Sequence, residues 1–260
     1  MNASWSFLFT LAMRKHIPNF LTCLNLLCGC LAIAKISNHE FDIAAKLVIA
    51  AAVIDFLDGF VAKLLNAKSE IGKQLDSLAD AVTFGVVPGY FLFVTLESLF
   101  KGMHLITTDS IFGVPLYFLF SSVAFVFTIA AALRLAKFNL DVRQHENFIG
   151  LPVPAAALFI MPLAFSLWDN ILDLESYLIS IPIILLIIFF LSLMMHAPLT
   201  MFGMKVKSLA WRGNEFRYIF AALAILSVVL LGYTGIPVAI ILYILISVIQ
   251  NLMKKNEIHS

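Results

Sequence analysis

Charged residues are scarce in this chain. Asp, Glu, Lys and Arg make up only 13% of its 260 residues, whereas 62% are apolar. Soluble domains carry about 25% charged and about 45–50% apolar residues. The composition therefore excludes an ordinary soluble globular protein and is typical of a protein embedded in a lipid bilayer.

Cysteine is also rare, at three residues, and Cys23, Cys28 and Cys30 all fall in one apolar run. This pattern is not a disulfide framework, and we expect the three side chains to serve as small apolar filling. The six histidines are scattered without the spacing of metal ligands, which argues against a zinc site. The net charge of +1 says nothing by itself about nucleic acid; we expect membrane lipid, and no nucleic acid, among the partners.

Long apolar runs make up most of the sequence. A bilayer core about 30 Å thick needs about 20 apolar residues for each helical span, so the sequence predicts an all-α, polytopic transmembrane helix bundle of about eight spans. The predicted spans are 17–36, 41–65, 75–100, 111–136, 149–168, 176–196, 216–232 and 236–253. No long polar linker separates them, so we expect one integral membrane catalytic domain at 17–253, with a cytoplasmic interfacial arm at 1–16 and a cytoplasmic tail at 254–260.

The basic residues indicate the orientation. Of the 17 Lys and Arg residues, all except Lys35, Lys46 and Lys101 fall on one side of the predicted bundle. Basic residues in short connections mark the cytoplasmic side. Both termini are therefore expected in the cytoplasm, with the chain integral to the cytoplasmic (inner) membrane. The first 13 residues lack the basic start of a cleavable signal peptide.

Besides Asp42 at the start of the second predicted span, four aspartates lie inside the second and third spans, where a carboxylate is costly and indicates function by default. Two stripes with helical spacing combine these acids with small residues: Asp55, Asp58, Gly59 and Ala62 on the first, and Gly72, Asp76 and Asp80 on the second. Because a short turn joins the two helices antiparallel, we expect the stripes to face each other near the cytoplasmic side.

Carboxylates this close together repel one another unless a cation neutralises them. Oxygen ligands at this density suit Mg²⁺ or Mn²⁺, and two such metals are able to clamp a diphosphate. The small residues leave room for a flat or phosphorylated ligand to approach the backbone. An ion or proton pathway is the alternative, but it does not explain small residues interleaved with the acids.

The two stripes read D-x-x-D-G-x-x-A-K-x8-G-x-x-x-D-x-x-x-D over residues 55–80. This pattern resembles the signature of the CDP-alcohol phosphatidyltransferase family, with Lys63 at the position where the family has arginine. The substitution keeps the charge but loses the bidentate fork of a guanidinium. The resemblance implies a metal-dependent membrane enzyme that transfers a phosphatidyl group from CDP-diacylglycerol to an alcohol and releases CMP. It also implies a homodimer.

The resemblance implies roles for individual residues. Asp55, Asp58 and Asp76 are expected to bind the metals, and Asp80 either shares in this or acts as the base that deprotonates the attacking hydroxyl. The residues expected at the CDP moiety lie on the first span or among the stripes: Asn19, Thr22, Asn25, Gly59, Ala62, Lys63 and Gly72. For the three on the first span, hydrogen bonding between helices is the alternative.

Five further stretches resemble the phosphatidylserine synthase branch of this family: 17–25, 76–88, 134–139, 148–154 and 193–198. They imply L-serine as the acceptor, with Arg134, Lys137 and Asn139 as the serine-binding residues. Arg134 lies inside an apolar run, where a cation indicates function, whereas Lys137 is also explained by anchoring at the cytoplasmic surface. Two other functions stay open: a sister enzyme that uses glycerol 3-phosphate or inositol phosphate, and an ion-coupled transporter.

Overall fold

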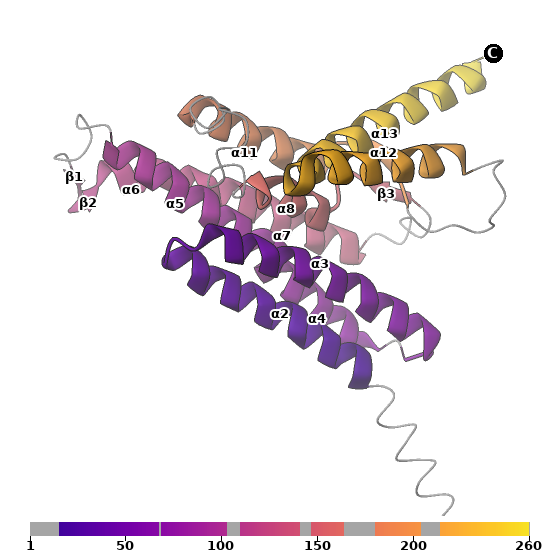
Figure 1. The fold of residues 1–260 in the computed structure, drawn as a ribbon, viewed down its shortest axis with the longest axis horizontal. Helices are drawn as coiled ribbons and strands as arrows, with labels where there is room; N and C mark the ends of the chain where they lie inside the picture. Colours follow the sequence, from indigo (N-terminus) through magenta and orange to yellow (C-terminus); the bar gives the residue numbers. More distant parts are fainter. Residues whose placement is uncertain are drawn as a thin grey trace, which may run out of the picture.

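The computed structural model describes residues 16–67, 69–102, 110–140, 147–163, 180–203 and 214–259. Residues 1–15 of the predicted arm lie outside these ranges, as do the cations at positions 14, 15, 68, 143, 205, 207 and 212. Most of the described chain is helical (Figure 1).

The helices, in chain order, are α2 (His16–Ser37), α3 (Phe41–Leu64), α4 (Glu70–Asp80), α5 (Val87–Gly102), α6 (Leu116–Ser121), α7 (Phe125–Leu140), α8 (Val153–Ile160), α11 (Ile181–His196), α12 (Glu215–Leu231) and α13 (Gly235–His259). A π-helical segment, η1 (Ala81–Val86), joins α4 to α5, and the 3₁₀ turns η2 (Ser122–Ala124) and η3 (Gly232–Thr234) precede α7 and α13.

In the part of the chain that the structure describes, two small antiparallel sheets accompany the helices. One pairs β1 (Ser110–Ile111) with β2 (Val114–Pro115), and the other pairs β3 (Asn147–Ile149) with β4 (Thr200–Phe202). The strictly all-α prediction misses them because strands of two or three residues leave no alternating pattern in the sequence.

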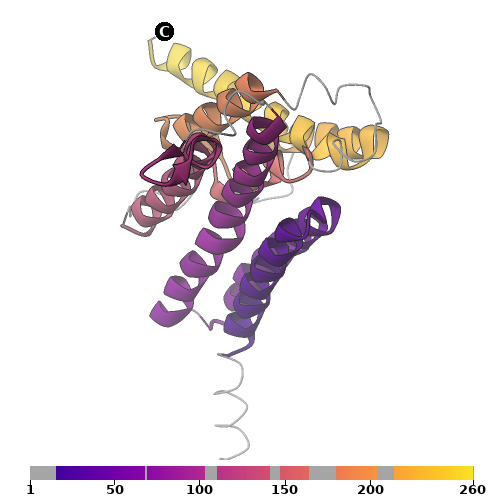
Figure 2. The same cartoon turned by 90° about the vertical axis from the view of Figure 1, so that its left-hand side faces the viewer.

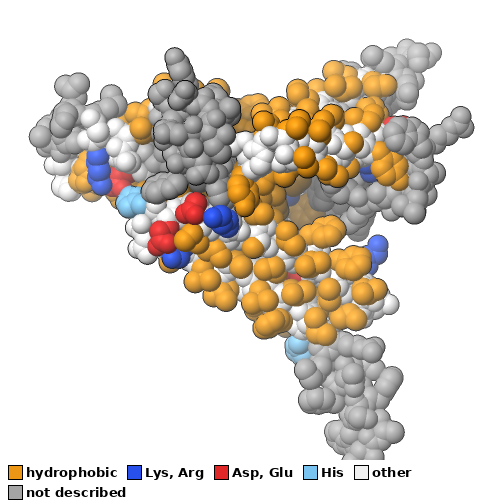
Figure 3. Space-filling view, viewed as in Figure 1, with side chains coloured by type: hydrophobic (Ala, Val, Ile, Leu, Met, Phe, Trp, Pro, Cys, Tyr) orange, Lys and Arg blue, Asp and Glu red, His pale blue; other side chains and the backbone are white. Residues whose placement is uncertain are grey.

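Within the described residues, four helical runs are long and apolar enough to cross a membrane: His16–Ser37, Glu70–Gly102, Leu116–Leu140 and Glu215–Met253. Helix α11 is apolar but has only 16 residues. Helix α3 has 24 residues, but five of them are charged: Asp42, Lys46, Asp55, Asp58 and Lys63. Each of the eight predicted ranges contains a described helix, yet eight crossings stay a prediction. Apolar side chains cover much of the surface, as expected of helices that face lipid (Figure 3).

Helices α2, α3 and α4 lie side by side as one group, with α5 rising from it toward the rest of the bundle (Figures 1 and 2). Small side chains line the α2–α3 contact, among them Ala32, Ala44 and Ala51, which are fully buried. Such residues let two backbones approach closely, which is how helices pack where no hydrophobic effect drives them together.

The π segment η1 begins directly after Asp80. At its end the Val87 N–H bonds five residues back, to the Val82 carbonyl. Pro88 follows directly and has no N–H to donate to the Phe84 carbonyl four residues before it. Two hydrogen bonds hold the segment to neighbouring helices. Thr83 Oγ1 of the segment donates to the Asn25 carbonyl of α2 at 3.2 Å, and Thr128 Oγ1 of α7 donates to the Gly85 carbonyl of the segment at 3.1 Å.

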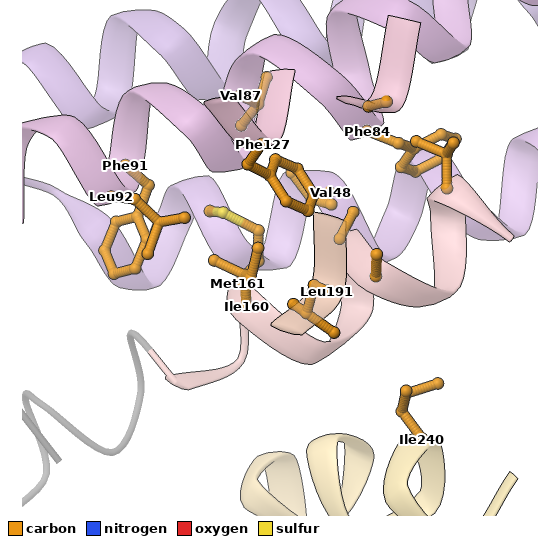
Figure 4. Close-up of a cluster of buried hydrophobic side chains, with 14 of the residues drawn as sticks. Val48, Phe84, Val87, Phe91, Leu92, Phe127, Ile160, Met161, Leu191 and Ile240 are labelled. Carbon is orange, nitrogen blue, oxygen red and sulfur yellow. The ribbon is translucent and has the colours of Figure 1, made fainter. Parts of the chain in front are cut away.

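The hydrophobic core lies where α5, α7, α8 and α11 meet (Figure 4). Phe84, Phe127, Met161 and Leu191 are fully buried there. The cysteine prediction is only partly correct. The three thiols are unpaired, but Cys23 and Cys30 are exposed on α2, and only Cys28 is partly buried.

Candidate functional site

Three of the four predicted aspartates form one cluster. Asp55 lies on α3, and Asp76 and Asp80 lie one turn apart on α4. One carboxylate oxygen from each falls within 4.8 Å of the others. Asp80 is buried, and the other two are partly buried. The antiparallel arrangement of α3 and α4 thus brings the two acidic stripes face to face.

Asp58 is held separately, by a residue of α2. Thr22 Oγ1 donates a 2.6 Å hydrogen bond to Asp58 Oδ2 and also lies 3.1 Å from the Pro18 carbonyl. One turn along α2, Asn25 Nδ2 donates to Asp80 Oδ1 at 3.4 Å. The polar face of α2 therefore contacts the acids directly. Hydrogen bonding between helices was the alternative role for Thr22 and Asn25 in the sequence analysis, and both residues form such bonds in this structure.

The acids fit a divalent cation. None of them forms a salt bridge with a Lys or Arg among the residues that the structure describes. Clustered carboxylates without a counter-charge repel one another. Asn25 Oδ1 adds a buried oxygen that has no hydrogen-bond partner beside Asp80. An all-oxygen donor set of this kind suits Mg²⁺ or Mn²⁺.

An open cleft of about 530 Å³ adjoins this cluster, and Asp58 and Asp76 form part of its wall. Five of the predicted CDP-binding residues line it: Asn19, Thr22, Gly59, Ala62 and Gly72. The other two do not. Asn25 is buried beside Asp80, and the Lys63 side chain is exposed. The cleft joins α2, α3 and α4 and is lined with polar groups and glycine, which suits a phosphorylated ligand.

The two glycines of the cleft have different surroundings. A Cβ added at Gly59 would meet nothing within 4 Å, so this position opens onto free space. A Cβ at Gly72 would lie 2.9 Å from Asn19 Oδ1 and 3.0 Å from Ser69 Oγ. Gly59 therefore leaves room for a ligand, whereas Gly72 is small because α2 packs against it.

Three polar cleft residues were missed by the sequence analysis: Ser69, Glu70 and Lys73. Ser69 caps α4, and its Oγ accepts the Gly72 N–H at 3.0 Å. A serine directly before an amphipathic helix is a recognisable N-cap signal, so this residue was detectable. Lys73 Nζ donates to the Asn139 carbonyl at 3.0 Å, a contact that no local pattern predicts.

The three predicted serine-binding residues lie on α7 in different environments. Arg134 is buried, its Nη2 has no hydrogen-bond partner, and its guanidinium lies 5.3 Å from the centre of the Phe138 ring. Lys137 is exposed. The Asn139 amide donates to Ser77 Oγ at 2.7 Å, which ties α7 to α4.

Comparison with known proteins covers this whole region. The family model described as CDP-alcohol phosphatidyltransferase matches residues 15–201. Similar proteins include three named CDP-diacylglycerol–serine O-phosphatidyltransferase. The Bacillus subtilis protein is 36% identical over 58% of this chain and 77% of its own length. The Helicobacter pylori (strain J99) protein is 34% identical over 55% of each. The Methanocaldococcus jannaschii protein is 31% identical over 95% of this chain and 98% of its own.

Proposed function

Because the chain belongs to the CDP-alcohol phosphatidyltransferase family, we propose that it transfers the phosphatidyl group of CDP-diacylglycerol to L-serine, forming phosphatidylserine and CMP. The names of the similar proteins support serine as the acceptor. The observation that carries the proposal is the acidic cluster beside the cleft. Arg134, on the neighbouring helix α7, adds a buried guanidinium whose Nη2 has no hydrogen-bond partner.

The donor's CDP group occupies the cleft in this proposal. Asn19 and Thr22 offer polar atoms from α2, and Gly59 and Ala62 leave space on α3. Asp55, Asp58 and Asp76, with Asp80, would hold two divalent cations, Mg²⁺ or Mn²⁺. Bound there, the cations would neutralise the diphosphate and stabilise the charge that develops on the leaving oxygen.

Asp80 serves as the general base. Its carboxylate takes the proton of the serine hydroxyl, and the hydroxyl oxygen then forms a bond to the phosphorus that carries diacylglycerol. The bond from this phosphorus to the oxygen bridging to CMP breaks, and CMP leaves with the electron pair. The Asn25 amide, which donates to Asp80, keeps the carboxylate in place. A positioned base of this kind contributes a rate factor of about 10²–10⁴.

Arg134 pairs with the carboxylate of serine. A guanidinium matches a carboxylate through two parallel hydrogen bonds, and Arg134 Nη2 has a donor without a partner for this purpose. Lys137 and Asn139 follow on the same helix. We assign Lys137 to the entrance of the acceptor site, because it is exposed, and Asn139 to the α4 side of the site, because it bonds Ser77.

The protein is integral to the membrane. We propose that the cleft and both termini face the cytoplasm, as the distribution of Lys and Arg indicates. Phosphorylated and zwitterionic substrates would then reach the site from the aqueous side, and the acyl chains of the donor would stay in the bilayer. Assembly as a homodimer is part of the proposal and rests on the family resemblance.

Acceptor-dependent release of CMP tests the function directly. The purified protein, reconstituted with CDP-diacylglycerol and Mn²⁺, is given L-serine, glycerol 3-phosphate or inositol phosphate in separate reactions. We expect CMP and phosphatidylserine with serine alone. CMP release only with glycerol 3-phosphate or inositol phosphate would identify a sister enzyme. No CMP release with any acceptor would reject the enzyme proposal and favour a transporter.

A further inference from the structure

Lys73 is the only cation among the described residues that line the cleft. The charged residues of this lining are Asp58, Glu70, Lys73 and Asp76. Lys73 lies three residues before Asp76 on α4, so the two side chains share one side of the helix. The mechanism above gives this lysine no role, although the diphosphate of the donor is negatively charged and the rest of the charged lining is acidic.

A hydrogen bond to α7 holds the lysine in place. Lys73 Nζ donates to the Asn139 carbonyl at 3.0 Å, in the last turn of α7. The last four carbonyls of a helix have no partner within the helix, so this contact also satisfies the end of α7. An ammonium group has three N–H donors, and the bond to Asn139 uses one of them. Two donors are left for a ligand in the cleft.

A second, uncharged contact ties the same two helices together. Asn139 Nδ2 donates to Ser77 Oγ at 2.7 Å, and Ser77 Oγ donates to the Lys73 carbonyl at 3.2 Å. Helix α4 is thus joined to α7 at two neighbouring points, and only one of them involves a charge. The charge of Lys73 and the tie between the helices can therefore be changed separately.

Lys63 does not line the cleft. The family resemblance puts this residue at the CDP moiety, in place of an arginine, but its side chain is exposed and does not belong to the cleft wall. Lys73 is exposed as well, yet it lies in the wall between Gly72 and Asp76. Of the two lysines, Lys73 is therefore the one that adjoins the space of the ligand.

We propose that Lys73 binds the diphosphate of the donor and supplies there the positive charge that the resemblance assigns to Lys63. This inference rests on the part of the proposed function that places CDP in the cleft. An ammonium binds a phosphate group as a point charge and needs no second parallel hydrogen bond. The bond to Asn139 keeps the ammonium at the wall, one helical turn from Asp76.

Lys73→Met tests the proposal, because it keeps most of the aliphatic stem and removes the charge. Titration of CDP into the purified full-length protein with Mn²⁺, followed by calorimetry, measures binding without an acceptor and without turnover. Loss of a hydrogen bond to a charged group should raise the Kd for CDP about ten- to a hundredfold. Lys73→Arg should recover most of the affinity, and Lys73→Gln serves if the methionine variant folds poorly.

Ser77→Ala is the matched control, since it removes the uncharged tie between α4 and α7 and leaves the lysine intact. Its Kd for CDP should equal that of the parent protein. Lys63→Met should weaken CDP binding less than Lys73→Met does. Unchanged CDP affinity in Lys73→Met would overturn the inference, as would an equal loss in Ser77→Ala, which would show that Lys73 only joins the two helices. A larger loss in Lys63→Met would overturn it as well.

The titration also separates this inference from the proposed reaction. A parent protein that binds CDP through Lys73 but releases no CMP with serine would overturn the proposed acceptor and support the role of the lysine. A parent protein that binds no CDP in the presence of Mn²⁺ would overturn both.

Discussion

Thr22 on α2 donates a 2.6 Å hydrogen bond to Asp58 on α3, although the two residues are 36 positions apart in the sequence. Both side chains are buried. The bond fixes one oxygen of an acid that stands outside the cluster of Asp55, Asp76 and Asp80. Residues that orient a metal-binding carboxylate in this way affect metal affinity although they do not bind the metal themselves.

Thr22→Val should raise the Mn²⁺ concentration needed for half-maximal CMP release by about 10- to 100-fold, the usual cost of losing a residue that orients a metal ligand. Thr22→Ser keeps the hydroxyl and should restore most of the affinity. A valine variant with the metal requirement of the parent protein would show that Thr22 only packs between the helices.

Asp55→Asn and Asp76→Asn should each abolish turnover, since each removes a charged ligand from the acidic cluster. Both variants should also lose the rise in melting temperature that Mn²⁺ gives the parent protein, a readout that does not depend on activity. Asp42→Asn is the control, because Asp42 lies at the other end of α3 and pairs with Lys46 at 3.2 Å. Full activity of the parent protein in a strong chelator would contradict the metal requirement.

Asp80→Asn should behave differently if Asp80 is the base. Binding of CDP-diacylglycerol should stay close to that of the parent protein, while the catalytic rate falls by about 10²–10⁴-fold. The two quantities are measured by donor titration and by single-turnover release of CMP. Loss of donor binding equal to that of Asp76→Asn would instead make Asp80 chiefly a metal ligand.

Gly59→Ala and Gly72→Ala form a matched pair with opposite expectations. A methyl group at Gly59 meets no protein atom within 4 Å, so the melting temperature should hold while the KM for CDP-diacylglycerol rises. A methyl group at Gly72 would press on Asn19, and overpacking of this kind costs about 1–3 kcal/mol of stability. A Gly59→Ala variant with unchanged donor affinity would place the nucleotide elsewhere.

Arg134→Ala should raise the KM for serine at least tenfold and leave the KM for the lipid donor nearly unchanged. A charged partner lost from a buried pair costs about 2–5 kcal/mol. Arg134→Lys should rescue only in part, because an ammonium lacks the fork that matches a carboxylate. Lys137→Ala, at the exposed position that we assign to the entrance of the acceptor site, should have a smaller effect.

Ethanolamine gives a second test of whether Arg134 binds the serine carboxylate, since it keeps the hydroxyl and amine of serine but lacks the carboxylate. It should be a poor acceptor for the parent protein and should lose little more in Arg134→Ala. If Arg134→Ala weakens donor and serine equally, the guanidinium serves the phosphate side of the site.

Composition and helical periodicity were enough to predict a membrane protein and two acidic stripes. Asp55 and Asp58 share a face because residues three apart lie on one side of a helix, and Asp76 and Asp80 do so at a spacing of four. Because only a short turn joins them, the two helices that carry these pairs run antiparallel. The cluster of Asp55, Asp76 and Asp80 could therefore be anticipated from local geometry alone.

Tertiary structure alone decided which partners these residues have. Nothing local in the sequence shows that Gly72 packs on Asn19 while Gly59 faces open space. The same holds for the pairing of β3 with β4 and its attachment to Tyr243 and Asn251. The physical reason is that periodicity records which face of a helix a residue lies on, whereas its neighbour across the interface depends on how separate segments pack together.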